Sequence, residues 1–148
     1  MKADLLKYRD RLKIKNLESG NLIWDLIRKK YLVLTPEELV RQLCLSFLIN
    51  QGQYPKEKIN VEKGLLISGR QYRYDLLVYN SKLQPFLLVE CKAPSVKLTD
   101  LTFQQISNYN RELKVPYLLI TNGPQLSIVH INWDTKTFEF LNDLPAYQ

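Results

Sequence analysis

The sequence predicts a mixed α/β (α+β) domain in which a central mixed β-sheet is flanked by helices. Its 148 residues fit one domain, and its 45% hydrophobic and 24% charged residues are typical of a globular chain. Helical patterns before and after a series of apolar, strand-like segments predict the element order α-β-β-β-α-β-β. We therefore expect a single domain over 1–148, with a basic helical lead-in over 1–34 and a core over 35–145.

Three helices are expected. The first is indicated by four apolar residues with helical spacing in the lead-in, Leu22, Ile23, Leu26 and Ile27. The second begins at Pro36, because Thr35 is a good N-cap and proline suits the first helical position. It is apolar on most sides over 39–49, which predicts a buried helix that ends before Gly52. The third covers 99–114, after the break at Pro94.

The strand-like segments are short runs rich in β-branched, aromatic and other apolar residues, bounded by turn residues. They are 59–67, 71–79, 86–92, 117–121, 126–133 and 138–141. Turns are expected at 68–70 and 80–85.

Several classes of protein are excluded by composition. No apolar run is long enough for a transmembrane helix, and the charged N-terminus has no secretory h-region. Two cysteines, Cys44 and Cys91, and one histidine, His130, are too few for a zinc site or a disulfide scaffold and make Ser-His-Asp catalysis unexpected. His130 is expected to be structural. The two thiols fit a reducing cytoplasm. The lack of a long apolar run predicts that the chain has no membrane partner.

The net charge is +6, and residues 1–15 hold six Lys and Arg against two Asp, a local balance of +4. Such a basic segment permits contact with nucleic acid, but a solvated basic face explains it equally well.

The strand predicted over 86–92 changes from apolar to charged. Because side chains alternate faces, Phe86, Leu88, Glu90 and Lys92 should share one face, with the carboxylate and ammonium about 7 Å apart. The pair lies at the end of the strand, where a site can open to solvent.

Asp75 lies on the preceding strand. If Tyr79 pairs with Phe86 in a hairpin, Asp75 faces Glu90, with Cβ atoms about 4.5–5.5 Å apart. Two opposed carboxylates repel unless a cation lies between them, and hard oxygen ligands suit Mg²⁺. The alternative is that these residues are unrelated surface charges or a cross-strand salt bridge.

The arrangement Asp75…Glu90-Cys91-Lys92 resembles the D…ExK core of the PD-(D/E)xK nuclease superfamily. The longer stretch, 73–79 with 85–94, resembles the N-terminal nuclease domain of type I restriction enzyme R subunits, over roughly 31–145. The resemblance implies a restriction-endonuclease-like fold. It also implies that Asp75 and Glu90 bind Mg²⁺, for which Mn²⁺ substitutes, that Cys91 adds its backbone carbonyl, and that Lys92 orients or activates water. Tyr74 stands where many members have proline.

Two further features of the family can be placed on the predicted helices. Gln105 and Tyr109 match a Gln-x-x-x-Tyr motif, which the resemblance places among the active-site residues. A helical wheel puts Gln105 on the inward arc with Leu98, Leu101, Ile106, Tyr109 and Leu113, where contact with the active site or DNA would explain a glutamine. A core glutamine bonded to backbone is the alternative. Glu38, followed by Arg41, matches the family's Glu-x-x-Arg pattern as a further metal-site acid, but it is also placed to complete a capping box with Thr35.

These observations predict a Mg²⁺-dependent DNA endonuclease of restriction type. Candidate phosphate contacts are Arg70, Arg73, Lys97 and the basic N-terminus. No P-loop is present, so the chain is not expected to translocate on DNA by itself. It is expected to be a stand-alone protein, with a homodimer as one form, or a partner of separate restriction-system subunits. One alternative is a catalytically silent DNA-binding or assembly subunit on the same fold. The other is a structural or regulatory protein without a nucleic-acid role.

Overall fold

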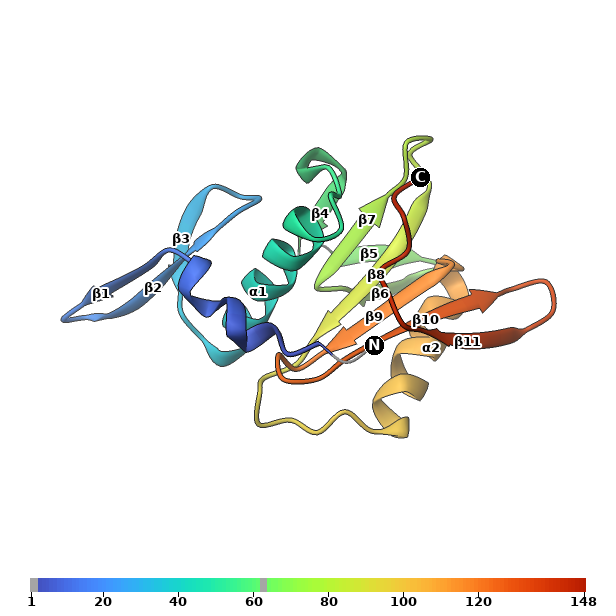
Figure 1. The fold of residues 1–148 in the computed structure, drawn as a ribbon. Coiled ribbons are helices and arrows are strands. Elements are labelled where there is room, and N and C mark those ends of the chain that lie inside the picture. The colour runs from blue at the N-terminus through green and yellow to red at the C-terminus, as the bar shows by residue number, and fades with distance from the viewer. Residues whose placement is uncertain (1–2, 62–63) are drawn as a thin grey trace.

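The computed structural model describes residues 3–61 and 64–148, which form a mixed α+β arrangement (Figure 1). A six-stranded sheet has the strand order β11-β10-β9-β8-β7-β4. Its strands are β4 (Ile59–Val61), β7 (Leu76–Tyr79), β8 (Pro85–Cys91), β9 (Tyr117–Thr121), β10 (Leu126–Asn132) and β11 (Thr137–Leu141). Strands β8 and β9 run parallel, and the other neighbouring pairs are antiparallel. Helix α2 (Asp100–Leu113) connects β8 to β9.

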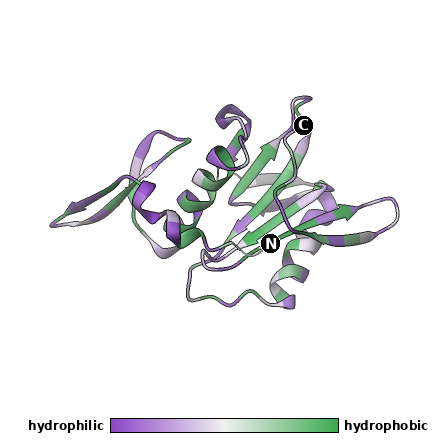
Figure 2. Ribbon diagram, in the orientation of Figure 1, coloured by the Kyte–Doolittle hydropathy of each residue, from purple (hydrophilic) through white to green (hydrophobic). Residues whose placement is uncertain are grey.

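Helices α1 (Pro36–Asn50) and α2 cover opposite faces of this sheet (Figure 1). The larger core lies on the α1 side and contains alternate residues of the central strands, among them Leu76, Leu87 and Val89. The smaller core lies on the α2 side around Leu77 and Leu88. Figure 2 shows the hydrophobic residues concentrated in the central strands and in α1. Among the described residues, no helix is both long and apolar enough to cross a membrane.

Helix α1 begins as predicted. Thr35 is its N-cap and accepts a 3.0 Å hydrogen bond from the backbone N–H of Glu38, and Pro36 occupies the first turn. Every residue from Val40 to Leu48 is buried, which agrees with its all-round apolar character.

The predicted helix in the lead-in is wrong. Residues 3–34 form a short 3₁₀ helix, η1 (Leu5–Arg11), followed by a three-stranded antiparallel sheet. Its strands are β1 (Ile14–Leu17), β2 (Gly20–Asp25) and β3 (Lys30–Val33). Ile23 is fully buried from within β2, and the Asp25 carboxylate accepts the backbone N–H groups of Ile27 and Arg28, which turns the chain. Pairing between strands cannot be read from the local spacing of apolar residues, and here it outweighs the weak helical pattern.

Several predicted strands are shorter than expected. The segments 59–67 and 71–79 are each divided, because β5 (Gly64–Ile67) and β6 (Arg70–Arg73) form a separate hairpin closed by Ser68 and Gly69, both at positive φ. Residues 62–63 of the first segment lie outside the described part of the chain. A short 3₁₀ helix, η2 (Lys56–Lys58), precedes β4. The described elements from α1 onward run α-β-β-β-β-β-α-β-β-β, so the predicted order had too few strands.

The β7–β8 hairpin has the predicted register at one end and a shift at the other. Leu76, Leu77 and Val78 pair with Val89, Leu88 and Leu87, respectively. Tyr79, however, pairs with Pro85 and not with Phe86, because the register shifts after Val78. Phe86 consequently packs in the α1-side core, away from Leu88, which corrects the expectation that the two share a face.

Candidate functional site

The predicted D…ExK residues meet where β7 begins and β8 ends. Asp75 immediately precedes β7, Glu90 is the last but one residue of β8, and Lys92 directly follows that strand. Continuing the Leu76–Val89 register by one residue places Asp75 opposite Glu90. One Asp75 carboxylate oxygen accepts a 2.8 Å hydrogen bond from the backbone N–H of Cys91. The carboxylate of Asp75 is thereby fixed against β8.

Glu90 lies in an environment that favours its protonated form. Burial, followed by the neighbouring charge of Asp75, raises its pKa from 4.5 to about 7. The Lys92 ammonium lies 3.4 Å from one oxygen of Glu90 and opposes this rise. The side chains of Glu90 and Lys92 are 25% and 35% exposed, so the pair is partly open to solvent. At neutral pH the two carboxylates therefore hold negative charge that a proton or a cation can offset.

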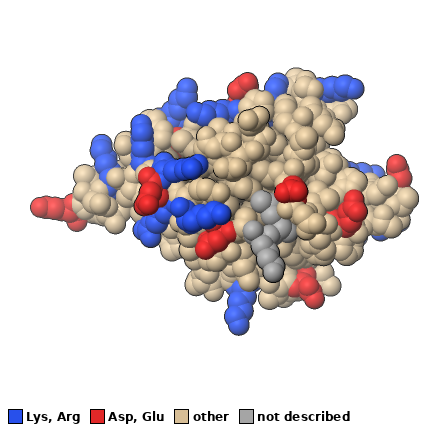
Figure 3. Space-filling model, in the orientation of Figure 1, with Lys and Arg blue, Asp and Glu red and all other residues tan. Residues whose placement is uncertain are grey.

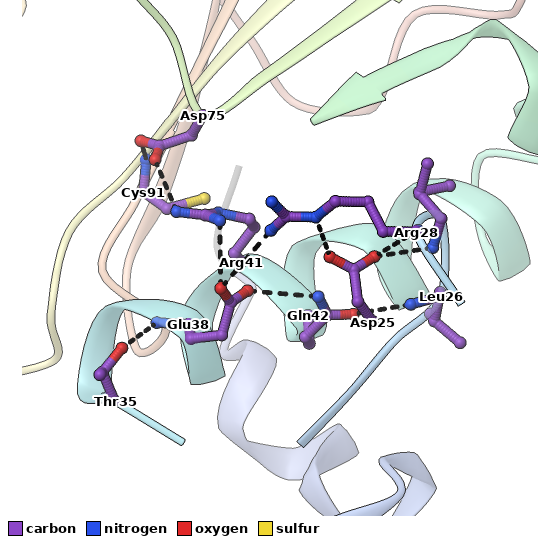
Figure 4. A network of polar contacts seen from close by, with 10 residues as sticks. Asp25, Leu26, Arg28, Thr35, Glu38, Arg41, Gln42, Asp75 and Cys91 are labelled. Atoms are coloured by element: carbon purple, nitrogen blue, oxygen red, sulfur yellow. Dashed lines mark hydrogen bonds and ion pairs between the residues drawn. The ribbon is translucent and has the colours of Figure 1, made fainter. Parts of the chain in front are cut away.

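Arg41 of α1 connects Asp75 to Glu38 (Figure 4). Its guanidinium lies 3.4 Å from one Asp75 oxygen and 3.1 Å from one Glu38 oxygen. The second Glu38 oxygen accepts a 3.2 Å hydrogen bond from the side chain of Gln42, one turn further along the helix. The Glu38 side chain thus points into this network, and its backbone N–H makes the cap contact with Thr35. Whether Glu38 also binds metal stays a prediction.

The same network extends to the N-terminal sheet. Arg28 donates a 2.8 Å hydrogen bond to the fully buried Asp25 and lies 3.9 Å from Glu38. Burial alone would raise the pKa of Asp25, but hydrogen bonds from the backbone and side chain of Arg28 hold it below its usual value. The backbone N–H of Leu26 donates to the Gln42 side chain at 3.2 Å.

Asp25, Arg28 and Gln42 belong to this site but were not predicted from the sequence. One signal was available for Gln42, since it lies one helical turn from Glu38 in a segment that is otherwise apolar and buried. No comparable signal marks Asp25 or Arg28.

Helix α2 does not have the predicted orientation. Its buried residues are Thr102, Ile106 and Asn110, whereas Leu101 is 61% exposed and Gln105 is exposed as well. The expected inward position of Gln105 is therefore wrong. The Asn110 amide instead provides the inward polar group, with 3.0 Å hydrogen bonds to the N–H and C=O of Val115. The side chain of Tyr109 lies outside what the structure describes, so its role stays a prediction.

Cys91 is buried on the α1 side, on the face opposite Glu90. A hydrogen bond with Cys44, together with burial, raises the pKa of its thiol well above the ordinary value, so the thiol stays protonated and is a poor nucleophile. His130 lies on β10, 3.6 Å from Glu139 and with its ring 4.9 Å from that of Tyr117. These contacts fit a structural histidine.

The predicted phosphate contacts lie on exposed surface. Arg70 and Arg73 belong to β6, and Lys97 lies in the connection from β8 to α2. Their roles in DNA binding stay predictions.

The donor set suits a hard divalent cation. Asp75 and Glu90 offer carboxylate oxygens, and the pKa of Glu90 is raised first by burial and then by the neighbouring charge of Asp75, which a cation would offset. Within residues 3–61 and 64–148, however, no group of three or more His, Cys, Asp or Glu side chains is arranged to hold a metal ion. Backbone carbonyls and water, both of which Mg²⁺ accepts, can complete the coordination.

Comparison with known proteins places the chain in a family. Residues 36–145 match the family model for the Type I restriction enzyme R protein N terminus (HSDR_N). The chain belongs to this family. The match covers most of the chain, from the start of α1 to beyond β11, and includes Asp75, Glu90 and Lys92. A search of curated proteins found no match.

A solved structure has a similar fold. It is described as a fragment of an HsdR subunit of a type I restriction enzyme from Vibrio vulnificus YJ016, and it aligns with a TM-score of 0.53 at 18% sequence identity. The alignment covers 76% of this chain and 24% of that chain. This HSDR_N-family chain thus spans about a quarter of the length of that solved fragment, and the likeness shows a shared fold.

Proposed function

We propose that this HSDR_N-family chain is a Mg²⁺-dependent DNA endonuclease domain of the PD-(D/E)xK superfamily, with a restriction-endonuclease-like fold. The observation that carries the proposal is the meeting of Asp75, Glu90 and Lys92 at the adjoining ends of β7 and β8. Membership in a restriction-enzyme family supports the reaction class. We expect Mn²⁺ to replace Mg²⁺.

Each site residue has its own role in this proposal. Asp75 and Glu90 hold the cation, and the backbone carbonyl of Cys91 is the candidate third oxygen. When bound, the cation supplies Lewis-acid stabilisation of the negative charge that develops on the phosphodiester. Lys92, held 3.4 Å from Glu90, orients the attacking water and stabilises developing charge. Arg41 fixes the carboxylate of Asp75.

A second candidate is a catalytically silent DNA-binding or assembly subunit. It is favoured by the ion pairs that both carboxylates make, Asp75 with Arg41 and Glu90 with Lys92. In that case the carboxylates serve structure, and cation binding is absent. Under either candidate, other restriction-system subunits or a second copy of the chain are the proposed protein partners, and a cytoplasmic location stays a prediction.

A plasmid assay separates the two candidates. Supercoiled DNA is incubated with the full chain in Mg²⁺, in Mn²⁺ and in EDTA, beside Asp75→Asn and the exposed control Asp134→Asn. An endonuclease nicks the plasmid with either cation, and Asp75→Asn abolishes nicking while Asp134→Asn does not. Equal activity of Asp75→Asn and the parent, or no cleavage with either cation, would refute the proposed catalytic site.

A further inference from the structure

Positive charge is concentrated at the N-terminus of the chain. Residues 1–34 contain nine of the 21 Lys and Arg but only four of the 15 Asp and Glu, so they carry +5 of the net charge of +6. One of the four acids, Asp25, is buried against Arg28. Residues 1–34 lie outside the matched family region. In Figure 3, blue side chains gather on the left of the molecule, where Figure 1 shows η1 and β1–β3.

The β1–β3 sheet projects from the body and has two different faces (Figure 1). Ile14, Ile23 and Leu32 are cross-strand neighbours on one face, and Ile23 is completely buried. Trp24 and Tyr31 pair across β2 and β3 and lie on the opposite face.

Lysines cover the aromatic rings on that second face. The Lys13 ammonium lies 5.6 Å from the centroid of the Trp24 ring, and the Lys15 ammonium lies 4.6 Å from that of Tyr31. Both lysines are exposed. Cation–π contacts restrict long side chains and keep their charges in place. Because ammonium groups cover the rings, this face suits phosphates better than it suits stacking of unpaired bases.

The sheet is attached directly to the candidate site. The turn after β2 contributes Arg28, which contacts Glu38, and Glu38 shares Arg41 with Asp75. The backbone N–H of Leu26 also donates to Gln42 of α1. A ligand held on β1–β3 would therefore be fixed in relation to Asp75.

We propose that the β1–β3 sheet is a DNA-binding arm whose Lys13 and Lys15 contact the phosphate backbone of duplex DNA near the candidate active site. The choice of DNA rests on the proposed function. Strand β2 has six residues, so the face is about 20 Å long and can lie against several consecutive phosphates. The arm binds without regard to sequence, because phosphate contacts carry no direct base information.

The test is a salt titration of binding between the full chain and a labelled duplex in EDTA, which prevents cleavage. The variant is Lys13→Gln with Lys15→Gln, and the control is Lys56→Gln with Lys82→Gln, which removes two charges elsewhere. The arm variant should bind several-fold more weakly, and its plot of log K against log salt should be shallower by about 1–2. Replacement of Lys13 and Lys15 by arginine should preserve binding, which distinguishes loss of charge from loss of folding.

A second readout locates the DNA. Trp133→Phe leaves Trp24 as the one tryptophan, and saturating duplex should change its fluorescence. An unchanged salt slope in the glutamine variant, an unchanged Trp24 signal, or tighter binding of single-stranded than of duplex DNA would overturn the proposal. If the arm variant loses binding while the parent binds but never cleaves with Mg²⁺, the arm is supported and the nuclease proposal fails. If the variant with Lys13→Gln and Lys15→Gln still cleaves DNA, and its binding has the same salt slope as that of the parent, the DNA-binding role of the arm is overturned and the nuclease proposal stands.

Discussion

Replacement of Glu90 by glutamine should stabilise the folded chain at about pH 8 and have little effect at pH 4.5. The pKa of Glu90 is raised on folding, so the folded chain binds more protons than the unfolded chain between 4.5 and about 7. The contribution of Glu90 to stability therefore falls as the pH rises through this window. Glutamine resembles the protonated acid and removes that loss.

The size of the effect follows from the shift. A rise from 4.5 to about 7 corresponds to about 3 kcal/mol, at about 1.4 kcal/mol per pH unit. Because the side chain is 25% exposed, water screens part of the cost, and we expect about 1–3 kcal/mol. For a chain of this length the melting temperature should rise by about 3–10 °C.

The assay is thermal unfolding in EDTA at both pH values for the parent, Glu90→Gln and the exposed control Glu112→Gln. The control should shift the melting temperature equally at the two pH values. Adding Mg²⁺ at about pH 8 should stabilise the parent more than Glu90→Gln, because a bound cation offsets the same buried charge. A Glu90→Gln variant that is no more stable than the parent at about pH 8, or equally stabilised at both pH values, would refute the reasoning.

Asp75→Ala should lose Mn²⁺ binding in a calorimetric titration, and normal binding would show that the carboxylate is not a ligand. Lys92→Ala should lose about 10²–10⁴ in cleavage rate while Mn²⁺ binding survives, so cleavage at the parent rate would exclude its role. Asn110→Ala should lower the free energy of unfolding by about 1–3 kcal/mol in urea, since it leaves the buried N–H of Val115 without its acceptor; the exposed Asn108→Ala is the control. A monomer has one set of site residues and should nick plasmid before any linear product forms; linear DNA without a nicked intermediate contradicts this expectation.

Much of the core could be predicted from the sequence because its signals are local. Thr35 and Pro36 begin α1 through contacts within one turn. Strand β9 has the predicted bounds, since its short apolar run is followed closely by turn residues. The spacing of Asp75, Glu90 and Lys92 also placed them together, because side chains alternate along each strand and a hairpin fixes the partner. Only the strand pairing next to the site had to be predicted correctly. The register shift at Tyr79 therefore did not affect the predicted position of these three residues.

The tertiary structure alone decided the other features. Ile23 belongs to a strand because burial and pairing with Ile14 and Leu32 outweigh a weak helical pattern. Gln105 faces outward because the capping of α2 at Thr99 and the bonds of Asn110 to Val115 fix the rotation of the helix. These outcomes depend on groups brought together by folding, and the free energy of such contacts is set by burial and geometry that local residue spacing does not encode.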